Sequence, residues 1–253
     1  MSLMINGELH DNWFDSEQAD GEFIRKDSQF RNWITVDGSP GPSGEGGFKA
    51  ETGRYHLVVS LACPWAHRTL IFRALKGLED INTVDIVHPH MGAAGWHFGT
   101  FENRPADNLY RLGHLHELYR MADPGYSGIV TVPVLWDKQR KTIVNNESSE
   151  IIRMFNSAFD TFTGNDCDYY PQALRTDIDA INALVYENIN KGVYRAGFAT
   201  SQEAYQKAYT RLFSALDLVE QRLGEQRYLA GEQVTEADWR LLTTLLRFDA
   251  VYY

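Results

Sequence analysis

The chain has 253 residues, of which 43% are hydrophobic and 23% charged, a composition typical of globular proteins with a substantial core. Its formal net charge of −10 argues against nucleic acid or an anionic membrane surface as a partner, because both attract basic proteins. No run of about 20 apolar residues predicts a membrane span. The N-terminus lacks a signal pattern, and Cys63 and Cys167 are the two cysteines, so we predict a reducing compartment, the cytoplasm.

Residues 1–53 are predicted to form an N-terminal extension rather than a domain. Glycine and proline are frequent over 38–47, and such a segment cannot hold a regular helix or strand. The preceding segment 30–34 is apolar enough to dock onto a hydrophobic core. We therefore expect a long arm that runs over the surface of the domain behind it.

Residues 54–160 have the pattern of an α/β domain. Strands are expected where β-branched and apolar residues cluster, over 55–60, 84–88, 130–136 and 141–144. The last two form a hairpin with its turn at 137–139. Helices are expected after residue 63, after the capping residues 145–150, and over 107–121 within the long insert between the second and third strands.

Residues 171–253 are predicted to form a helical domain after a polar linker. Apolar residues recur at helical spacing throughout this region, which predicts several amphipathic helices. Within it, the sequence Thr235-Glu236-Ala237-Asp238 has the pattern of a capped helix start. Its expected role is in folding rather than in chemistry.

The sequence Cys63-Pro64-Trp65-Ala66-His67-Arg68 lies where the first predicted strand passes into a helix. A thiol at a helix N-terminus faces unpaired N–H groups and the positive end of the helix dipole, which favour the nucleophilic thiolate. A lone cysteine is more often a buried apolar residue, but a proline in the first helical turn favours the functional interpretation here. His67 could act as a general base, although an exposed or packed histidine is the commoner case.

Two further sites in the sequence carry two interpretations each. Pro133 interrupts the third predicted strand, which indicates either an edge strand or bulge, or a cis peptide bond after Val132. Glu147 and Ser148 open a predicted helix, whose N-terminus either binds an anion or is simply capped. Trp96 lies in the long insert, where an isolated tryptophan usually packs in the core.

The segment 57–69, LVVSLACPWAHRT, resembles the Xi class of the glutathione transferase superfamily, the glutathionyl-hydroquinone reductases. Further matching stretches extend from about the N-terminus to the last residue. The resemblance implies a thioredoxin-like α/β N-terminal domain with an N-terminal extension, followed by an all-α C-terminal domain, and it implies a homodimer. The family's helical domain continues beyond the position of Tyr253, so we interpret this one as truncated at its C-terminus.

The resemblance also implies roles for particular residues, with Cys63 as the catalytic nucleophile, glutathione as co-substrate and no metal ion. It predicts contacts to glutathione from Trp96, Val132, Pro133, Glu147 and Ser148. Tyr194 would line the substrate pocket and donate a hydrogen bond to a quinol oxygen. The cation that meets the glycyl carboxylate stays open among Arg68, Arg120 and Arg153.

The predicted function is glutathione-dependent reductive deglutathionylation of glutathionyl-hydroquinones. No second cysteine stands near Cys63 in the motif, so its mixed disulfide with glutathione must be resolved by a second glutathione. One alternative is an Omega-like thioltransferase or dehydroascorbate reductase, which shares the one-cysteine chemistry and differs in the pocket. Another is a non-catalytic member of the superfamily that uses the fold for binding.

Overall fold

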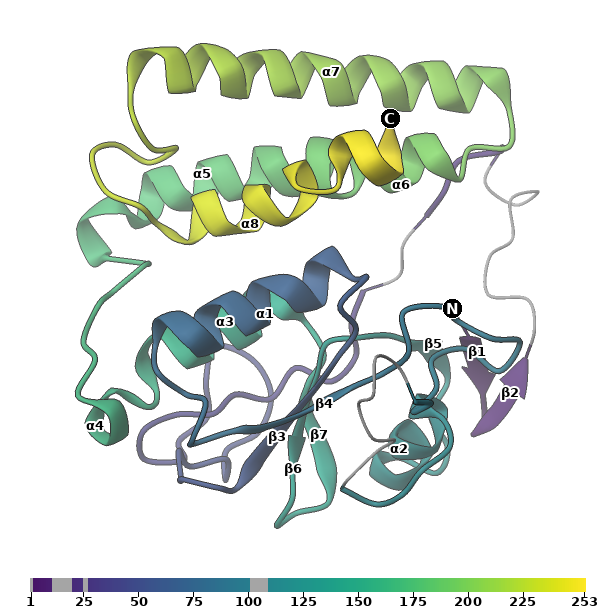
Figure 1. Ribbon diagram of the computed structural model, residues 1–253, viewed down its shortest axis with the longest axis vertical. Coiled ribbons are helices and arrows are strands. Elements are labelled where there is room, and N and C mark those ends of the chain that lie inside the picture. The colour runs from purple at the N-terminus through teal and green to yellow at the C-terminus, as the bar shows by residue number, and fades with distance from the viewer. Residues whose placement is uncertain (1, 11–19, 25–26, 101–108) are drawn as a thin grey trace. The chain divides into compact units, whose positions relative to one another are not determined.

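The computed structural model describes residues 2–10, 20–24, 27–100 and 109–253, which form two compact units (Figure 1). Unit 1 comprises Met1–Trp13 and Lys26–Cys167, and unit 2 comprises Phe14–Arg25 and Asp168–Tyr253. The first 53 residues thus contribute to both units. The domain boundaries expected from the sequence, at 54–160 and 171–253, stay a prediction.

A four-stranded sheet forms the centre of unit 1, with the strand order β4-β3-β6-β7. Its strands are β3 (Tyr55–Val59), β4 (Thr83–Ile86), β6 (Val134–Asp137) and β7 (Thr142–Asn145). β3 pairs parallel with β4 and antiparallel with β6, and β6 pairs antiparallel with β7. All residues of β3 are buried, as expected for a central strand that is covered on both faces. The predicted thioredoxin-like order is confirmed.

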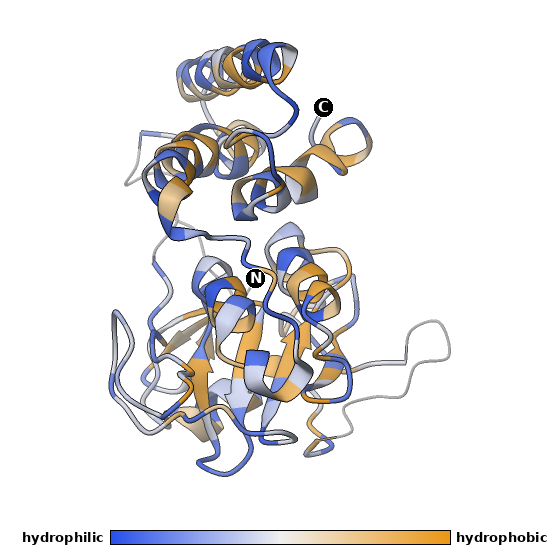
Figure 2. Ribbon diagram, turned by 90° about the vertical axis from the view of Figure 1, so that its left-hand side faces the viewer, coloured by the Kyte–Doolittle hydropathy of each residue, from blue (hydrophilic) through white to orange (hydrophobic). Residues whose placement is uncertain are grey.

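Two helices of unit 1 lie side by side above this sheet in Figure 1, α1 (Pro64–Leu75) and α3 (Ser148–Ser157). In α1 the buried residues Ala66, Thr69 and Phe72 recur every three positions, so one stripe of the helix faces the core. Figure 2 shows the strands largely in hydrophobic colours and the helices with mixed colouring, which matches this one-sided burial. A short helix, α4 (Asp160–Thr163), ends at Gly164, which adopts a left-handed conformation.

A second, smaller sheet has the order β2-β1-β5 and was not predicted from the sequence. It is formed by β1 (Ser2–Ile5), β2 (Glu8–His10) and β5 (Gly128–Val130). Asn6 and Gly7 connect β1 to β2, and both have positive φ, as the common two-residue hairpin turn requires. The prediction of a single strand over 130–136 was wrong, because this segment is divided between two sheets. The division falls at Pro133, which has no N–H to donate to a ladder.

The helix predicted over 107–121 begins later than the leucine spacing indicated. The structure has α2 over Leu115–Ala122, while residues 101–108 lie outside the described residues. Before the helix, Gly113 accepts a backbone hydrogen bond from Phe98, so this stretch pairs with an extended segment instead. His114 then caps α2, with its N–H donating to the Glu117 carboxylate at 2.8 Å. Pairing in the tertiary structure therefore overrides helical periodicity here.

Unit 2 is helical, as predicted. After a short 3₁₀ turn (Gln172–Leu174), its helices are α5 (Arg175–Val185), α6 (Gly192–Gly197), α7 (Gln202–Glu225) and α8 (Glu236–Leu245). One π-helical turn (Tyr186–Asn190) joins α5 to α6, and another (Phe248–Tyr252) follows α8. Buried aliphatic residues on the inner faces of these helices form the core of unit 2. Among the described residues, no helix combines the length and the hydrophobicity that a membrane span requires.

The predicted cap at the start of α8 is present and links two segments. The Asp238 carboxylate accepts hydrogen bonds from the N–H groups of Thr235 and Leu229, each at 2.8 Å. Thr235 and Leu229 are both buried. Asp238 therefore satisfies two buried donors that would otherwise have no partner.

We expect Asp238→Ala to lower the free energy of unfolding of unit 2 by about 2–3 kcal/mol, because two buried N–H groups lose their acceptor. Denaturant unfolding followed by circular dichroism measures this change. Asp217→Ala is the matched control, since Asp217 is an exposed aspartate on α7, and it should shift stability by less than about 0.5 kcal/mol. Equal effects of the two substitutions would contradict the role of the cap.

Candidate active site

Cys63 lies at the junction of β3 and α1. Its backbone is still extended, with φ −83° and ψ 120°, and Pro64 is the first helical residue. The turn is closed by the Cys63 N–H, which donates to the Ser60 carbonyl at 3.1 Å. The Cys63 carbonyl in turn accepts from the His67 N–H at 3.0 Å, the first bond of the helix. The half-buried thiol is thereby held at the positive end of the α1 dipole.

The Val132–Pro133 segment lies directly opposite this thiol. The peptide bond between the two residues is cis, and the Val132 carbonyl oxygen is 3.6 Å from Cys63 Sγ. Val132 takes part in none of the strand pairs of the described structure, because β5 ends at Val130 and β6 begins at Val134. The fold thus brings together two predicted site residues that are 69 positions apart. The backbone of Val132 lies outside the ladders, where an extended peptide could pair with it.

Glu147 and Ser148 open α3 in two different roles. The Glu147 carboxylate is the cap, accepting from the N–H of Ser149 at 3.1 Å and from its hydroxyl at 2.9 Å. Ser148 is the first helical residue and is only 2% exposed. The cap of α3 is thus Glu147 and not Ser148. The Ser148 hydroxyl lies at the N-terminus of a helix, a position where anions bind.

Arg68 is the cation that the structure places at this helix start. Arg68 is 1% exposed, and its guanidinium donates to the Ser148 hydroxyl at 3.4 Å and lies over the Trp65 ring at 4.8 Å. Arg120 instead donates to the Gly7 carbonyl in the hairpin between β1 and β2. Arg153 lies within α3. Arg68 is thus in contact with a predicted glutathione-binding residue.

Trp96 follows a tight turn and is 7% exposed. Gly92 and Gly95 exchange two backbone hydrogen bonds in this turn, and Gly95 has φ +82°. A Cβ on Gly95 would lie 2.4 Å from the Ser2 hydroxyl, so only glycine fits there. The Trp96 carbonyl accepts from the Leu115 N–H at 2.9 Å, which ties the tryptophan to the start of α2. Its predicted contact with glutathione stays a prediction.

Tyr194 lies on α6 in unit 2, so its predicted role beside Cys63 also stays a prediction. The half-buried Tyr194 ring packs among three aromatic neighbours. These are Phe23 at 6.5 Å, Phe198 at 6.2 Å and Tyr252 at 5.9 Å between ring centroids. An aromatic cluster thus surrounds the residue that was expected to meet an aromatic substrate.

Sequence reasoning missed the polar network that holds the N-terminal extension against this site. Asn145 donates to the Asn32 carbonyl at 2.9 Å and to the Glu150 carboxylate at 2.7 Å, and Arg31 forms an ion pair with the same carboxylate. Ser28 donates to Glu147 itself at 3.3 Å. The sequence feature that could have revealed this network is the asparagine pair at 145–146, because these polar residues lie between a buried strand and a helix start.

Comparison with known proteins agrees with this geometry. Residues 62–158 match the family "Glutathione S-transferase, N-terminal domain", and residues 202–253 match "Glutathione S-transferase, C-terminal domain". The chain is 58% identical over 253 residues to the glutathionyl-hydroquinone reductase YqjG of Escherichia coli, covering 100% of this chain and 77% of that protein. The glutathione-bound structure of YqjG has a TM-score of 0.90 at 55% identity, covering 99% of this chain and 76% of that one.

A crystal structure of the glutathione S-transferase Xi of Phanerochaete chrysosporium has a TM-score of 0.87 at 51% identity. The match covers 92% of this chain and 74% of the Phanerochaete chrysosporium chain. The chain belongs to the Xi class of glutathione transferases. The family and fold that the segment 57–69 indicated are therefore confirmed.

A cluster of histidine rings adjoins Trp96 in this Xi-class transferase. It comprises His88, His90, His97, His114 and His116. The His88 and His97 rings stack at 4.6 Å, and the His114 and His116 rings at 5.3 Å. Burial lowers the pKa of His97, and the positive charges that His88 and His114 can carry lower it further. Burial also lowers the pKa of His116. The described residues hold no set of histidine, cysteine or carboxylate groups arranged to bind a metal ion.

These lowered pKa values predict that acid destabilises unit 1. An unfolded histidine titrates near pH 6.5, so below that pH the unfolded chain binds protons that folded His97 and His116 do not yet accept. The free energy of unfolding should therefore fall as the pH drops below about 6.5, until the folded histidines are protonated as well. Chemical unfolding at several pH values should show a weaker fall for His97→Gln. If the free energy of unfolding depends on pH in the same way for the variant and the unmodified chain, His97 is not the origin of the acid destabilisation.

Proposed function

We propose that this protein catalyses the glutathione-dependent reductive deglutathionylation of glutathionyl-hydroquinones. The observation that carries the proposal is the half-buried Cys63 thiol at the N-terminus of α1, 3.6 Å from the Val132 carbonyl. A thiolate at this position is a nucleophile toward sulfur. The similar proteins named glutathionyl-hydroquinone reductases supply the substrate class. Glutathione is the co-substrate.

In the first step, the Cys63 thiolate attacks the glutathionyl sulfur of the conjugate. A disulfide bond forms between Cys63 and glutathione while the bond from sulfur to the aromatic carbon breaks. The aromatic carbon keeps the electron pair and takes up a proton, which yields the free hydroquinone. In the second step, the thiolate of another glutathione attacks this mixed disulfide, releasing oxidised glutathione and the Cys63 thiolate.

The residues around Cys63 have proposed binding roles that follow from their positions. The Val132 backbone, next to Pro133, pairs with the cysteinyl residue of glutathione. The Ser148 hydroxyl and the N-terminus of α3 receive the γ-glutamyl carboxylate, and buried Arg68 adds positive charge there. Glu147 takes the γ-glutamyl ammonium.

The remaining proposed contacts concern the aromatic parts of the site. Trp96 packs over glutathione, and Tyr194 donates a hydrogen bond to an oxygen of the hydroquinone. A homodimer and a cytoplasmic location stay predictions for this protein.

We expect Cys63→Ser to abolish turnover of glutathionyl-menadione and to leave glutathione binding intact, because serine cannot form the mixed disulfide. Turnover is followed by product chromatography, and binding by calorimetry. Cys167→Ser is the matched control, since Cys167 is an exposed cysteine, and it should keep full activity. Turnover by the Cys63 variant would contradict the mechanism. Faster turnover of dehydroascorbate than of the conjugate would favour the Omega-like alternative.

We expect Trp96→Ala to weaken glutathione binding by ~1–3 kcal/mol, the scale of one buried aromatic contact. Because Trp96 is buried, the melting temperature should fall as well. Phe98→Ala is the matched control, since Phe98 is buried in the same segment at 5% exposure, and it should lower the melting temperature without changing affinity. An equal loss of affinity in both variants would mean that Trp96 acts only through packing.

A further inference from the structure

The Tyr119 hydroxyl lies at the centre of a buried hydrogen-bond network in unit 1. Tyr119 belongs to α2 and is 0% exposed. Its hydroxyl donates to the Thr131 carbonyl at 2.9 Å and accepts from the Thr131 N–H at 3.2 Å. It also accepts from the side-chain amide of Asn146 at 3.1 Å. One hydroxyl thus connects two segments that are far apart in the sequence.

The first of these segments leads directly into the backbone opposite Cys63. Thr131 lies between β5 and β6, in neither strand, and directly precedes Val132. The Val132 carbonyl is in turn 3.6 Å from Cys63 Sγ. Backbone N–H and C=O groups that leave a strand ladder inside a protein need other partners. The Tyr119 hydroxyl serves both groups of Thr131, and it therefore fixes the course of the chain into Val132.

The second segment leads into the start of α3. Asn146 is 4% exposed and directly precedes Glu147, the cap of this helix, and Ser148. Its side-chain amide donates to Tyr119, and its side-chain carbonyl accepts from the Phe30 N–H at 3.2 Å. Because both ends of the amide are bound, a shift of Asn146 would break a buried hydrogen bond. The start of α3 is therefore tied to the same hydroxyl as the Val132 segment.

Aromatic packing holds the Tyr119 ring in place. Phe30 meets the ring edge-on with centroids 5.8 Å apart, and Tyr126 lies at 5.0 Å. Tyr126 is also buried, but its hydroxyl donates to the Ile129 carbonyl at 3.1 Å. The two tyrosines thus share one packing environment, while their hydroxyls bind different residues. This difference allows the two hydroxyls to be compared in an experiment.

The distance between the two connected segments matters for a ligand that contacts both. In the proposed function, the Val132 backbone pairs with the cysteinyl residue of glutathione, and Glu147 and Ser148 bind its γ-glutamyl group. One amide bond joins these two parts of glutathione, so the spacing of their binding segments can vary little. A shift of one segment would weaken binding or move the glutathionyl sulfur away from Cys63.

We propose that Tyr119 is a positioning residue for glutathione. Its hydroxyl sets the spacing between the Val132 segment and the start of α3, and it acts through Thr131 and Asn146 rather than on the reacting atoms. This inference rests on the glutathione-binding part of the proposed function and not on the identity of the aromatic substrate.

The test compares Tyr119→Phe with Tyr126→Phe in the 253-residue chain. Each substitution removes one buried hydroxyl and keeps the ring, so both should lower the melting temperature by a few degrees. Calorimetric titration with reduced glutathione should show binding weakened by about tenfold or more for Tyr119→Phe. For Tyr126→Phe the affinity should stay within about twofold of that of the unmodified chain. Circular dichroism establishes that each variant is folded.

Two reactions of Cys63 provide a second measurement. Alkylation by iodoacetamide depends on the thiolate at the start of α1, so both variants should react as fast as the unmodified chain. Peptide mass spectrometry separates this product from alkylated Cys167. With oxidised glutathione, the Cys63 thiolate attacks one sulfur, forms the mixed disulfide and releases the other half as glutathione thiolate. At low oxidised glutathione this rate should fall about tenfold or more in Tyr119→Phe alone, because the glutathionyl group is misplaced.

The proposal is overturned if the two variants bind glutathione equally well. It is also overturned if alkylation slows as much as mixed-disulfide formation in Tyr119→Phe, since the substitution would then act on the thiol itself. Absence of saturable glutathione binding by the unmodified chain would contradict it as well. Turnover of glutathionyl-menadione is measured separately. Its absence in the unmodified chain would contradict the proposed reaction, while the glutathione measurements would still decide the role of Tyr119.

Discussion

The turn at the end of β3 fixes the position of the Cys63 thiol, and the candidate site is built around it. β3 is buried along its whole length between β4 and β6, so its end cannot shift. The turn passes directly into α1, so the sulfur lies at the N-terminus of this helix. Because β6 is antiparallel to β3, the segment before β6 returns to the same edge of the sheet and brings Val132 opposite Cys63.

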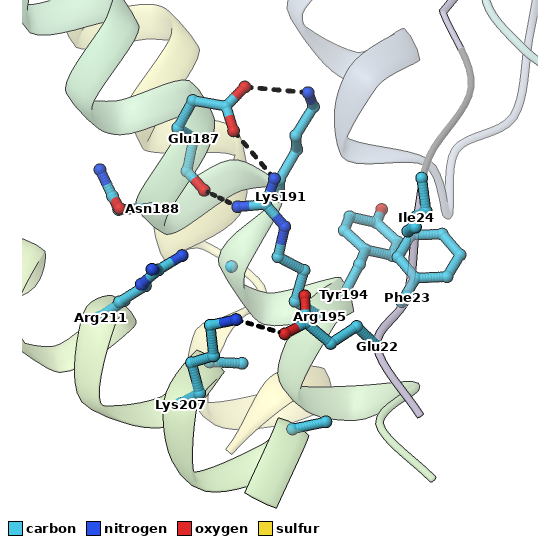
Figure 3. Close-up of a pocket in the computed structure, with 13 residues that line it drawn as sticks. Glu22, Phe23, Ile24, Glu187, Asn188, Lys191, Tyr194, Arg195, Lys207 and Arg211 are labelled. Carbon is cyan, nitrogen blue, oxygen red and sulfur yellow. Dashed lines mark hydrogen bonds and ion pairs between the residues drawn. The ribbon is translucent and has the colours of Figure 1, made fainter. Parts of the chain in front are cut away.

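The N-terminal extension belongs to the architecture of this site. Residues 28–32 run beside β7 and the start of α3, with backbone hydrogen bonds from Asn32 to Val144 and from Asn146 to Phe30. Side chains of the extension also contact the carboxylates of Glu147 and Glu150. The start of α3 is thus supported from outside the thioredoxin-like fold, in the way that neighbouring groups orient the ligands of a binding site. A second part of the extension, residues 22–24, belongs to unit 2 and lines a cavity beside α6 and α7 (Figure 3).

Charge is distributed differently in the two sites. At the start of α3, buried Arg68 and the helix N-terminus create positive potential in a nearly water-free setting, where each charge acts strongly. In the cavity of unit 2 beside α6 and α7, Lys191, Arg195, Lys207 and Arg211 are more exposed, and several must act together because water screens each of them. A protein with a net charge of −10 can thus still have two local regions that attract anions.

The sequence by itself determined the thioredoxin-like order, the helical second half, the cap at Thr235–Asp238 and the place of Cys63 at a helix start, because each depends on neighbouring residues and local periodicity. Only the tertiary structure decided that Arg68 meets Ser148, that Glu147 caps α3 and that residues 128–137 serve two sheets. It also decided that α2 begins at Leu115 and that the extension supports the site. These features depend on contacts between residues far apart in the chain, and local sequence patterns carry no information about such contacts.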